Sequence, residues 1–297
     1  MELPVINHED YFAKIGDDHK FPINKFGELA NYLLKKKIIN QFHKPYPCSV
    51  KTLKGAHSQT YISNIINKSL DQNGVKKIGF PLVDSVVKRS LVATGGTVLA
   101  SKLALEYRIA CNTAGGSHHA NFDGGAGYCV FNDVAVAANY LLNKGLVKKI
   151  LIVDLDVHQG NGNSDIFENN KNVFTFSMHS KSNYPAKKSK SDLDIELEDN
   201  TEDQKYIETL KDSIQLLNKQ KFDFVFYIAG VDVHFNDRLG KLKLSDDGIK
   251  KREEIVIGNF FSKKIPICGV LGGGYNKNFD KLVELHSILH ETCAKYI

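Results

Sequence analysis

The chain has 297 residues, of which 42% are hydrophobic and 25% charged, close to the averages of soluble globular proteins, which excludes a disordered, collagen-like or coiled-coil chain. Its formal charge of +5 comes with lysines in small clusters interleaved with acids, so we expect no direct contact with nucleic acid. No apolar run approaches the roughly 18–20 residues that span a bilayer, and the N-terminal MELPVINHEDYF lacks the apolar segment of a signal peptide, so we expect a cytoplasmic protein without membrane contact.

The predicted elements alternate between helices and short apolar strands. In the N-terminal third, apolar residues at helical spacing predict helices over 25–39 and 99–107, the second shortly after a turn at Gly95-Gly96. The remaining predicted elements are strands over 149–154, 172–178, 222–228 and 265–271, and helices over 132–143 and 202–218. Short strands that are apolar throughout are typical of a parallel sheet buried on both faces. We therefore expect one three-layer α/β/α domain over residues 1–297, with a mainly parallel sheet.

Residues with catalytic chemistry gather next to these predicted strands. The motif DLDVHQGNG occupies 154–162 after the first strand, AGVD occupies 229–232 after the third, and GGGY occupies 272–275 after the fourth. A glycine-rich segment, GGSHH at 115–119, precedes the first strand. Because ligands of open α/β sheets bind beyond the carboxyl ends of the strands, these segments predict one shared site there.

Asp156 and His158 are the first candidate metal ligands. Residues two apart in an extended segment point to the same side, so a carboxylate and an imidazole can bind one ion, and Asp232 is the obvious third ligand. This set suits Zn²⁺, with Fe²⁺ or Co²⁺ as alternatives, and three protein ligands leave positions open for water and substrate, as in catalytic sites. Taken alone, the Asp-x-His pair could equally cap a helix or bind loop backbone.

His118, His119 and Tyr275 are the candidate proton-transfer and oxyanion groups. Two imidazoles supply a proton acceptor and donor near neutral pH, and the glycines around them allow the backbone to approach a substrate closely. A phenol after three glycines could donate to a developing oxyanion. Isolated histidine pairs are more often surface residues, and an isolated tyrosine is usually a packing residue. The catalytic interpretation of these three residues therefore depends on the motifs next to them.

In this order, the motifs are similar to those of the zinc-dependent histone deacetylase family, which has the arginase/deacetylase fold. The resemblance covers nearly the whole chain and is closest to class IV members and their bacterial relatives. It rests on HKFP at 19–22, DLDVHQGNG at 154–162, NDRLG at 236–240 and GGGY at 272–275. It implies a hydrolase that removes acetyl or longer acyl groups from lysine, with the three candidate ligands holding zinc.

The resemblance also implies roles for the remaining polar residues. His119 would be the general base, and His118 would stabilise charge beside it, held by Asp154. Asn161 stands where some members of the family place an aspartate as partner of the second histidine, and an amide should bias His119 less strongly toward its protonated form. Tyr275 would donate a hydrogen bond to the substrate carbonyl.

For the substrate, the resemblance implies an acyl-lysine tunnel lined by Gly127 and Tyr128, with Leu239 at its mouth. Polyamine-preferring relatives have a glutamate at the position of Leu239, so leucine speaks against polyamines. The substrate would be an acylated lysine on a protein or peptide, or a small acylated amine, with chain length open. A potassium ion is implied beside the site, at Asp154, Asp156, His158, Ser177 and Met178.

Two other interpretations remain open. A dinuclear manganese ureohydrolase of the same fold needs more carboxylates than residues 154–162 offer, because Asn161 replaces one acid. An inactive module that binds acylated partners is disfavoured by the complete set of candidate ligands. The sequence leaves the oligomeric state open.

Overall fold

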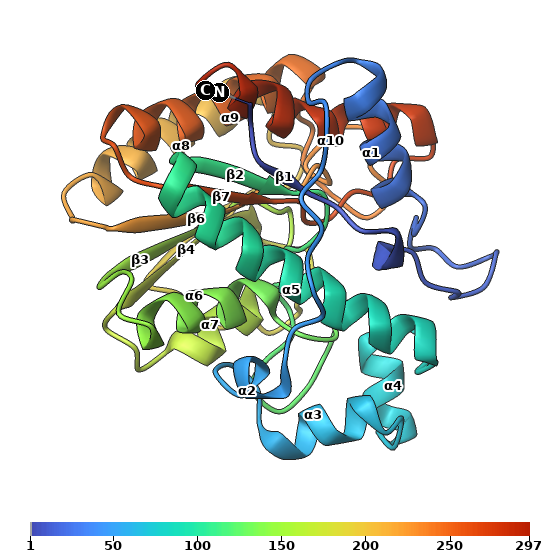
Figure 1. Cartoon of the computed structure of the whole chain (residues 1–297). Helices are drawn as coiled ribbons and strands as arrows, with labels where there is room; N and C mark the ends of the chain where they lie inside the picture. Colours follow the sequence, from blue (N-terminus) through green and yellow to red (C-terminus); the bar gives the residue numbers. More distant parts are fainter. Residues whose placement is uncertain (1) are drawn as a thin grey trace.

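A seven-stranded parallel sheet runs through the middle of the computed structural model, which describes residues 2–297 (Figure 1). The strand order is β1-β2-β7-β6-β3-β4-β5. The strands are β1 (Val5–Ile6), β2 (Ile109–Asn112), β3 (Ile150–Asp154), β4 (Val173–Ser180), β5 (Leu193–Leu197), β6 (Phe224–Ile228) and β7 (Ile267–Val270). β3 pairs with β4 on one side and with β6, which comes later in the chain, on the other. The strand order therefore reverses at β3, and in open α/β sheets ligands bind in the crevice that such a reversal opens at the carboxyl ends of the strands.

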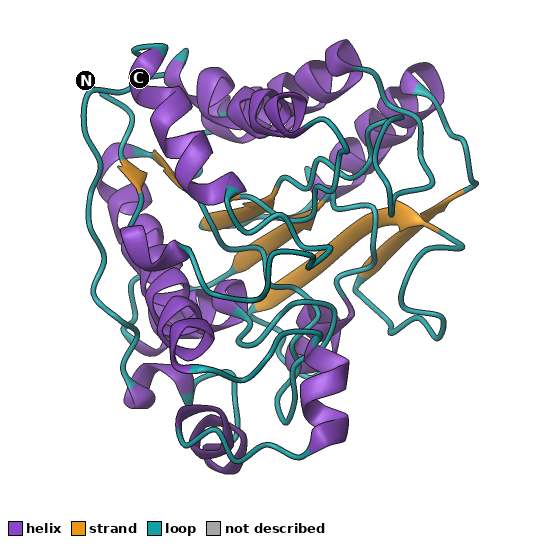
Figure 2. Cartoon of the chain, turned by 90° about the vertical axis from the view of Figure 1, so that its right-hand side faces the viewer, coloured by secondary structure: helices purple, strands orange, loops and turns teal. Residues whose placement is uncertain are grey.

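Helices cover both faces of the sheet and make the fold a three-layer structure (Figure 2). One layer contains α1 (Lys25–Lys35), α8 (Asp203–Leu217), α9 (Asp246–Ser262) and α10 (Phe279–Ala294). The other contains α5 (Asp84–Tyr107), α6 (Asp133–Asn143) and α7 (Asn161–Phe167), with the short helices α2 (Val50–Leu53), α3 (Gln59–Ile66) and α4 (Gln72–Ile78) beyond it. Within residues 2–297, no helix combines the length and the apolar character that a membrane crossing requires.

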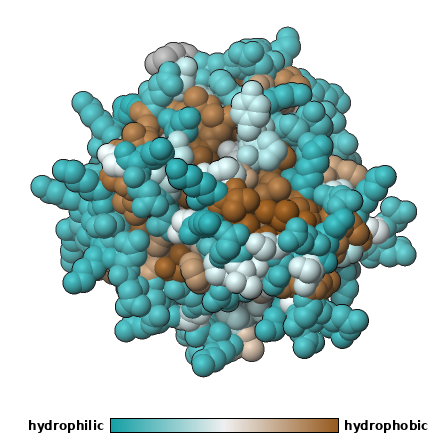
Figure 3. All heavy atoms as spheres, turned by 60° about the horizontal axis from the view of Figure 1, so that its bottom comes forward, coloured by the Kyte–Doolittle hydropathy of each residue, from teal (hydrophilic) through white to brown (hydrophobic). Residues whose placement is uncertain are grey.

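The burial of the strands explains the apolar runs in the sequence. Every residue of β2, β3, β6 and β7 is buried, so both faces of these strands need apolar side chains. On the face shown in Figure 3, hydrophilic residues cover most of the surface and hydrophobic residues gather near the middle. The predicted three-layer α/β fold with a mainly parallel sheet is therefore confirmed, and the sheet is parallel throughout.

The four predicted strands and three of the predicted helices are found with small shifts at their ends, but three strands were not predicted. β1 has only two residues, β2 has four, and β5 alternates apolar and acidic residues and is only partly buried, so none of them gives a long apolar run. The GGSHH segment therefore follows a strand, β2, in the same way as the other motifs follow theirs. This addition places all four motifs at the same edge of the sheet.

The predicted turn at Gly95-Gly96 is wrong, because both glycines lie inside α5. A Cβ atom at Gly95 would lie 2.0 Å from the carbonyl oxygen of Tyr46, and one at Gly96 would lie 2.1 Å from the hydroxyl of Tyr11. Both positions therefore allow neighbouring chain segments to touch the helix backbone. Close packing, rather than a change in chain direction, explains this glycine pair.

We predict that Gly95→Ala destabilises the protein by about 1–3 kcal/mol, the usual cost of overpacking, because the new methyl group meets backbone that cannot rotate away. Gly27→Ala is the matched control, since Gly27 lies inside α1 with open space around its Cβ position. It should stabilise the protein by about 0.4–1 kcal/mol. Urea unfolding of both variants measures the difference, and equal stability of the two would contradict this account of the Gly95 contact.

Candidate functional site

The loops that follow β2, β3, β6 and β7 meet at the carboxyl edge of the sheet, and their polar side chains point toward one another. His118, His119, Asp156 and Asp232 are all buried there, although they come from three different loops. The segment after β3 bends instead of continuing as a strand, which differs from the extended geometry expected for residues 156–158. The side chains of that segment still converge.

Asp156, His158 and Asp232 form a compact cluster whose ligand atoms all lie within 4.8 Å of one another. His158 Nδ1 lies 3.0 Å from Asp156 Oδ1 and 3.1 Å from Asp232 Oδ2. Asp232 Oδ2 is buried, and within residues 2–297 no donor is aligned to hydrogen-bond with it. Two carboxylates and one imidazole with an unsatisfied buried oxygen fit a divalent cation of the zinc type.

The charges of the cluster also favour a cation. Burial and the neighbouring Asp156 carboxylate raise the pKa of Asp232 to about 7. Burial disfavours the charged form of His158, but its close contacts with the Asp156 and Asp232 carboxylates outweigh burial and raise the pKa of His158 to about 10. Positive charge is therefore stabilised at this point, and a divalent ion would hold both carboxylates in their ionised form.

Glycines next to the cluster leave room for the carboxylates. A Cβ atom at Gly273 would lie 1.8 Å from Asp232 Oδ2, and one at Gly230 would lie 2.5 Å from Asp156 Oδ2. The Gly273 N–H donates a hydrogen bond of 2.5 Å to Asp156 Oδ2. The GGGY motif therefore approaches the cluster through its bare backbone.

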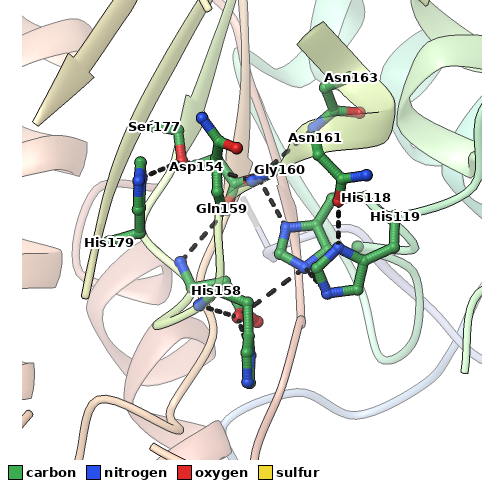
Figure 4. Close-up of polar contacts among 12 residues, drawn as sticks. His118, His119, Asp154, His158, Gln159, Gly160, Asn161, Asn163, Ser177 and His179 are labelled. Carbon is green, nitrogen blue, oxygen red and sulfur yellow. Dashed lines mark hydrogen bonds and ion pairs between the residues drawn. The ribbon is translucent and has the colours of Figure 1, made fainter. Parts of the chain in front are cut away.

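His118 and His119 lie beside the cluster: His118 Nε2 is 3.8 Å from Asp156 Oδ1, and Figure 4 shows both rings near His158. His118 Nδ1 lies 2.8 Å from Asp154 Oδ2, and its Nε2 lies 3.1 Å from His119 Nε2. Burial disfavours the imidazolium of His118, yet Asp154 and Asp156 outweigh burial and raise its pKa to about 9. Burial, followed by the charges of His118 and His158, holds the pKa of His119 well below its ordinary value. The pair thus combines one imidazolium and one neutral imidazole.

Asn161 determines which nitrogen of His119 is free. Its side-chain oxygen lies 2.7 Å from His119 Nδ1, and an amide oxygen only accepts, so Nδ1 carries the proton and Nε2 keeps its lone pair. Gly127 packs against the same ring, because a Cβ atom there would lie 2.5 Å from His119 Cδ2. The lone pair of His119 Nε2 is thereby held toward His118 Nε2, 3.1 Å away and beside the metal cluster.

Tyr275 is buried and presents its phenol to the site. Its backbone N–H donates to Asp237 Oδ2 at 2.7 Å, and its carbonyl oxygen accepts from Arg238 Nε at 2.8 Å. Burial and the charges of Asp232 and Asp156 raise the pKa of the Tyr275 phenol well above its ordinary value. The hydroxyl therefore stays protonated and can act as a hydrogen-bond donor.

An outer cavity of about 970 Å³ leads from the surface to these groups. Gly127, Tyr128, Leu239 and Tyr275 line it, together with His119 and His158. Gly127 and Tyr128 both have positive φ values, of 55° and 66°, so the chain turns sharply at this wall. Leu239 is 36% exposed, in keeping with a position at the mouth.

Tyr184 also lines the outer cavity, and the motif analysis did not identify it. Its ring packs edge-on against His119, with the ring centroids 4.8 Å apart. It lies in the loop after β4, where the sequence has no cluster of catalytic residue types. Only its position after a predicted strand could have drawn attention to it.

An inner cavity of about 40 Å³ adjoins the catalytic groups. Its lining includes Arg89 of α5 together with residues of the catalytic site, namely His118, His119, Asp156, His158 and Tyr275. Arg89 was not identified from the sequence, because a single arginine in a helix carries no motif.

Arg252 of α9 is a further residue that the sequence did not reveal. Its guanidinium is fully buried and donates to the carbonyl oxygens of Leu155 at 3.1 Å and Gly230 at 2.7 Å. It also forms an ion pair of 2.6 Å with Glu253. Because Leu155 and Gly230 lie just before two candidate ligands, Arg252 ties together the two loops that carry them.

The residues expected at a potassium site lie on neighbouring strands. Asp154 at the end of β3 pairs with Ser177 of β4, and Met178 follows in the same strand. The Ser177 hydroxyl lies 3.0 Å from His179 Nδ1. The expected potassium ligands on β3, on β4 and in the loop after β3 are thus near one another. The potassium site itself stays a prediction.

Comparisons with known proteins agree on one family. A family profile described as the histone deacetylase domain matches residues 19–288. The chain is 43% identical to an uncharacterised protein of Picosynechococcus, with 98% of each chain covered. It is 28% identical to "Histone deacetylase 2" of Arabidopsis thaliana, with 92% of this chain and 73% of that protein covered.

Solved structures show the same fold. A crystal structure of an HDAC homolog complexed with SAHA has a TM-score of 0.84 at 24% identity, covering 99% of this chain and 84% of that one. An HDAC homolog from Aquifex aeolicus has a TM-score of 0.82 at 22% identity, with the same coverage.

We predict that the metal-free protein binds one Zn²⁺ per chain and that binding raises its melting temperature, because the ion binds only the folded cluster. Asp232→Asn should weaken zinc binding at least roughly a hundredfold. Losing a residue that only hydrogen-bonds to a metal ligand already costs up to about a hundredfold in affinity, and Asp232 is a proposed ligand itself. Asp165→Asn, which removes an exposed carboxylate from α7, is the control. Calorimetric titration measures both quantities. Two ions per chain, or unchanged affinity in Asp232→Asn, would be incompatible with the assignment.

Proposed function

Since the chain belongs to the histone deacetylase family of metal-dependent amide hydrolases, we propose that it is a zinc-dependent deacylase of acyl-lysine side chains, with residues 1–297 as its catalytic domain. The observation that carries the proposal is the Asp156, His158 and Asp232 cluster, which lies beside both histidines at the inner end of the outer cavity. The motifs at 19–22, 154–162, 236–240 and 272–275, which are closest to those of class IV members, support a class IV type.

The chemistry begins with the binding of an ion by these three residues. When bound there, zinc would polarise the amide carbonyl and lower the pKa of water from 15.7 toward about 7. His119 Nε2 accepts the proton from the attacking water, because this nitrogen carries no proton and the pKa of His119 is low. His119 then passes that proton to the leaving lysine amine.

The two other polar groups stabilise the charge that develops. Tyr275 donates a hydrogen bond to the oxygen of the substrate carbonyl as it becomes an oxyanion. His118 stays protonated beside it, with Asp154 at 2.8 Å holding its far nitrogen. Both groups are buried, so their electrostatic effect is only weakly screened by water.

The lining of the outer cavity supports a lysine side chain as the leaving group. Tyr128 and Tyr184 offer aromatic surface to the methylene groups, and Leu239 offers no countercharge for a second ammonium, which disfavours polyamines. We propose an acylated lysine on a protein or peptide as substrate, with a small acylated amine as the alternative. A potassium ion at Asp154, Asp156, His158, Ser177 and Met178 completes the proposal.

The rival activities have less support. A ureohydrolase with two metal ions needs a second group of ligands, and residues 2–297 contain only one cluster of the required kind. An inactive binding module would have no need for a complete cluster, two oriented histidines and a protonated phenol around one cavity.

We predict that Tyr275→Phe lowers kcat roughly a hundredfold or more, because one oxyanion donor is worth about 3–4 kcal/mol. Zinc content and melting temperature should stay unchanged, since the phenol oxygen is not among the ligands. Tyr140→Phe removes a hydroxyl from α6, outside both cavities, and serves as the control. Steady-state hydrolysis of an acetyl-lysine peptide measures the effect. A near-normal rate in Tyr275→Phe would remove the proposed role of this residue.

An acyl-chain panel tests the function itself. Acetyl-, decanoyl- and myristoyl-lysine peptides are compared with the zinc-loaded protein, with Asp232→Asn as the control that lacks a ligand. We expect hydrolysis that depends on zinc and prefers the acetyl group, because the inner cavity of about 40 Å³ has no room for a long chain. Turnover of none of the three peptides would refute the proposal.

A further inference from the structure

The inner cavity has the size of a short acyl tail. A water-sized group needs about 10–15 Å³ of such space, so about 40 Å³ accommodates roughly three of them. Tyr275 and His119 line both cavities, so a lysine that enters through the outer cavity with its carbonyl beside Tyr275 would direct its acyl group into this space. The residues that line the inner cavity therefore contact the end of the acyl group.

Arg89 is the unusual residue of this wall. Its side chain is only 8% exposed, and it stacks on Phe26 and Phe21, with its guanidinium carbon 4.7 and 5.6 Å from the ring centroids. Its Nε donates to the Tyr11 carbonyl oxygen at 3.0 Å. Within residues 2–297, this is the only hydrogen bond of the side chain, which leaves its two terminal nitrogens without a partner, and the side chain forms no ion pair. A buried guanidinium without an acid is costly, which calls for a partner.

The buried groups around Arg89 do not neutralise it at contact distance. Asp133 is the nearby acid, but its carboxylate oxygens accept from the Thr97 hydroxyl at 2.6 Å and from the backbone N–H groups of Gly116 and Ser117 at 3.1 and 2.8 Å. Burial raises the pKa of the Cys129 thiol to about 12, so this neighbour is uncharged.

Positive charge persists at this wall. Burial lowers the pKa of Arg89 only to about 10, so it remains a cation at neutral pH. Lys25 packs on the same two rings, with Nζ 5.3 Å from the Phe21 centroid and 5.5 Å from the Phe26 centroid. Its Nζ donates to the Gly272 carbonyl oxygen at 3.1 Å.

We propose that Arg89 forms an anion subsite at the inner end of the acyl cavity, and that the enzyme prefers short acyl groups ending in a carboxylate, such as malonyl and succinyl, to neutral groups of the same size. This inference rests on the proposed deacylase function. The terminal carboxylate accepts hydrogen bonds from the unpaired N–H groups of the guanidinium. The planar guanidinium can donate two parallel hydrogen bonds, one to each carboxylate oxygen. The reaction is unchanged: water adds to the carbonyl carbon, the amide C–N bond breaks, and the lysine amine takes the proton, leaving a dicarboxylate.

The test compares two peptides that differ only in the charge of the acyl end, one with succinyl-lysine and one with succinamoyl-lysine, its neutral amide. We expect the wild type to hydrolyse the succinyl peptide with at least a tenfold higher kcat/KM. In Arg89→Met this ratio should fall to near one, and Arg89→Lys, which keeps a point charge without the fork, should retain part of it. Lys102→Met, which removes an exposed cation from the same helix, is the matched control and should keep the full ratio.

Succinate binding to the zinc-loaded protein gives a second readout that needs no turnover. Calorimetry should show at least tenfold weaker binding of succinate in Arg89→Met than in Lys102→Met, with no comparable difference for butyrate. If Arg89→Met fails to fold, the test rests on the ratio of kcat/KM for the succinyl and succinamoyl peptides in the wild type and in Arg89→Lys.

Three results would overturn the subsite: equal rates for the two peptides in the wild type, a ratio that survives in Arg89→Met, or an equal slowing of acetyl and succinyl substrates. The last result would mark a structural or product-release role. If the wild type hydrolyses none of the acyl-lysine peptides, the proposed function is wrong, and succinate binding then decides the subsite by itself.

Discussion

The structure depends on concentrating negative charge at the carboxyl edge of a buried parallel sheet. Asp154, Asp156 and Asp232 come from the exits of two adjacent strands and lie in the protein interior. Ionised carboxylates are stable there only when cations and aligned donors surround them. The imidazoles, the glycine backbone and the cation that the cluster fits all answer this requirement. The catalytic chemistry is a consequence of that electrostatic arrangement.

The arrangement is held from behind by packing that carries no catalytic motif. Arg252 binds the carbonyl oxygens of Leu155 and Gly230 and so fixes the spacing of the two loops that contain the ligands. Its charge is matched by Glu253, which in turn accepts a hydrogen bond from the hydroxyl of Tyr227 in β6. A buried ion pair of this kind contributes orientation more than net stability. The site therefore relies on α9 as much as on the strand exits.

Much of this could be predicted from the sequence, for a physical reason. β3 and β6 are buried on both faces and so are apolar throughout, which makes them visible, and polar residues stand out at their ends. The short β1 and the partly exposed β5 lack that contrast. For the same reason Asp156, His158 and Asp232 can be grouped from the sequence alone, whereas Arg89 and Tyr184 reach the cavities only through tertiary packing. The Gly95-Gly96 pair was misread because glycine serves tight helix contacts as well as turns.

One consequence concerns the turn at Gly127 and Tyr128, where two successive residues have positive φ values. The same few atoms support the ring of His119 and form the wall that faces the substrate. Substitutions that reshape this wall will also disturb the ring of the base. Substrate selectivity and catalytic rate therefore cannot change independently at these two positions. New substrate preferences in this fold are therefore expected to evolve at surfaces that the base does not touch, such as the outer rim at Leu239.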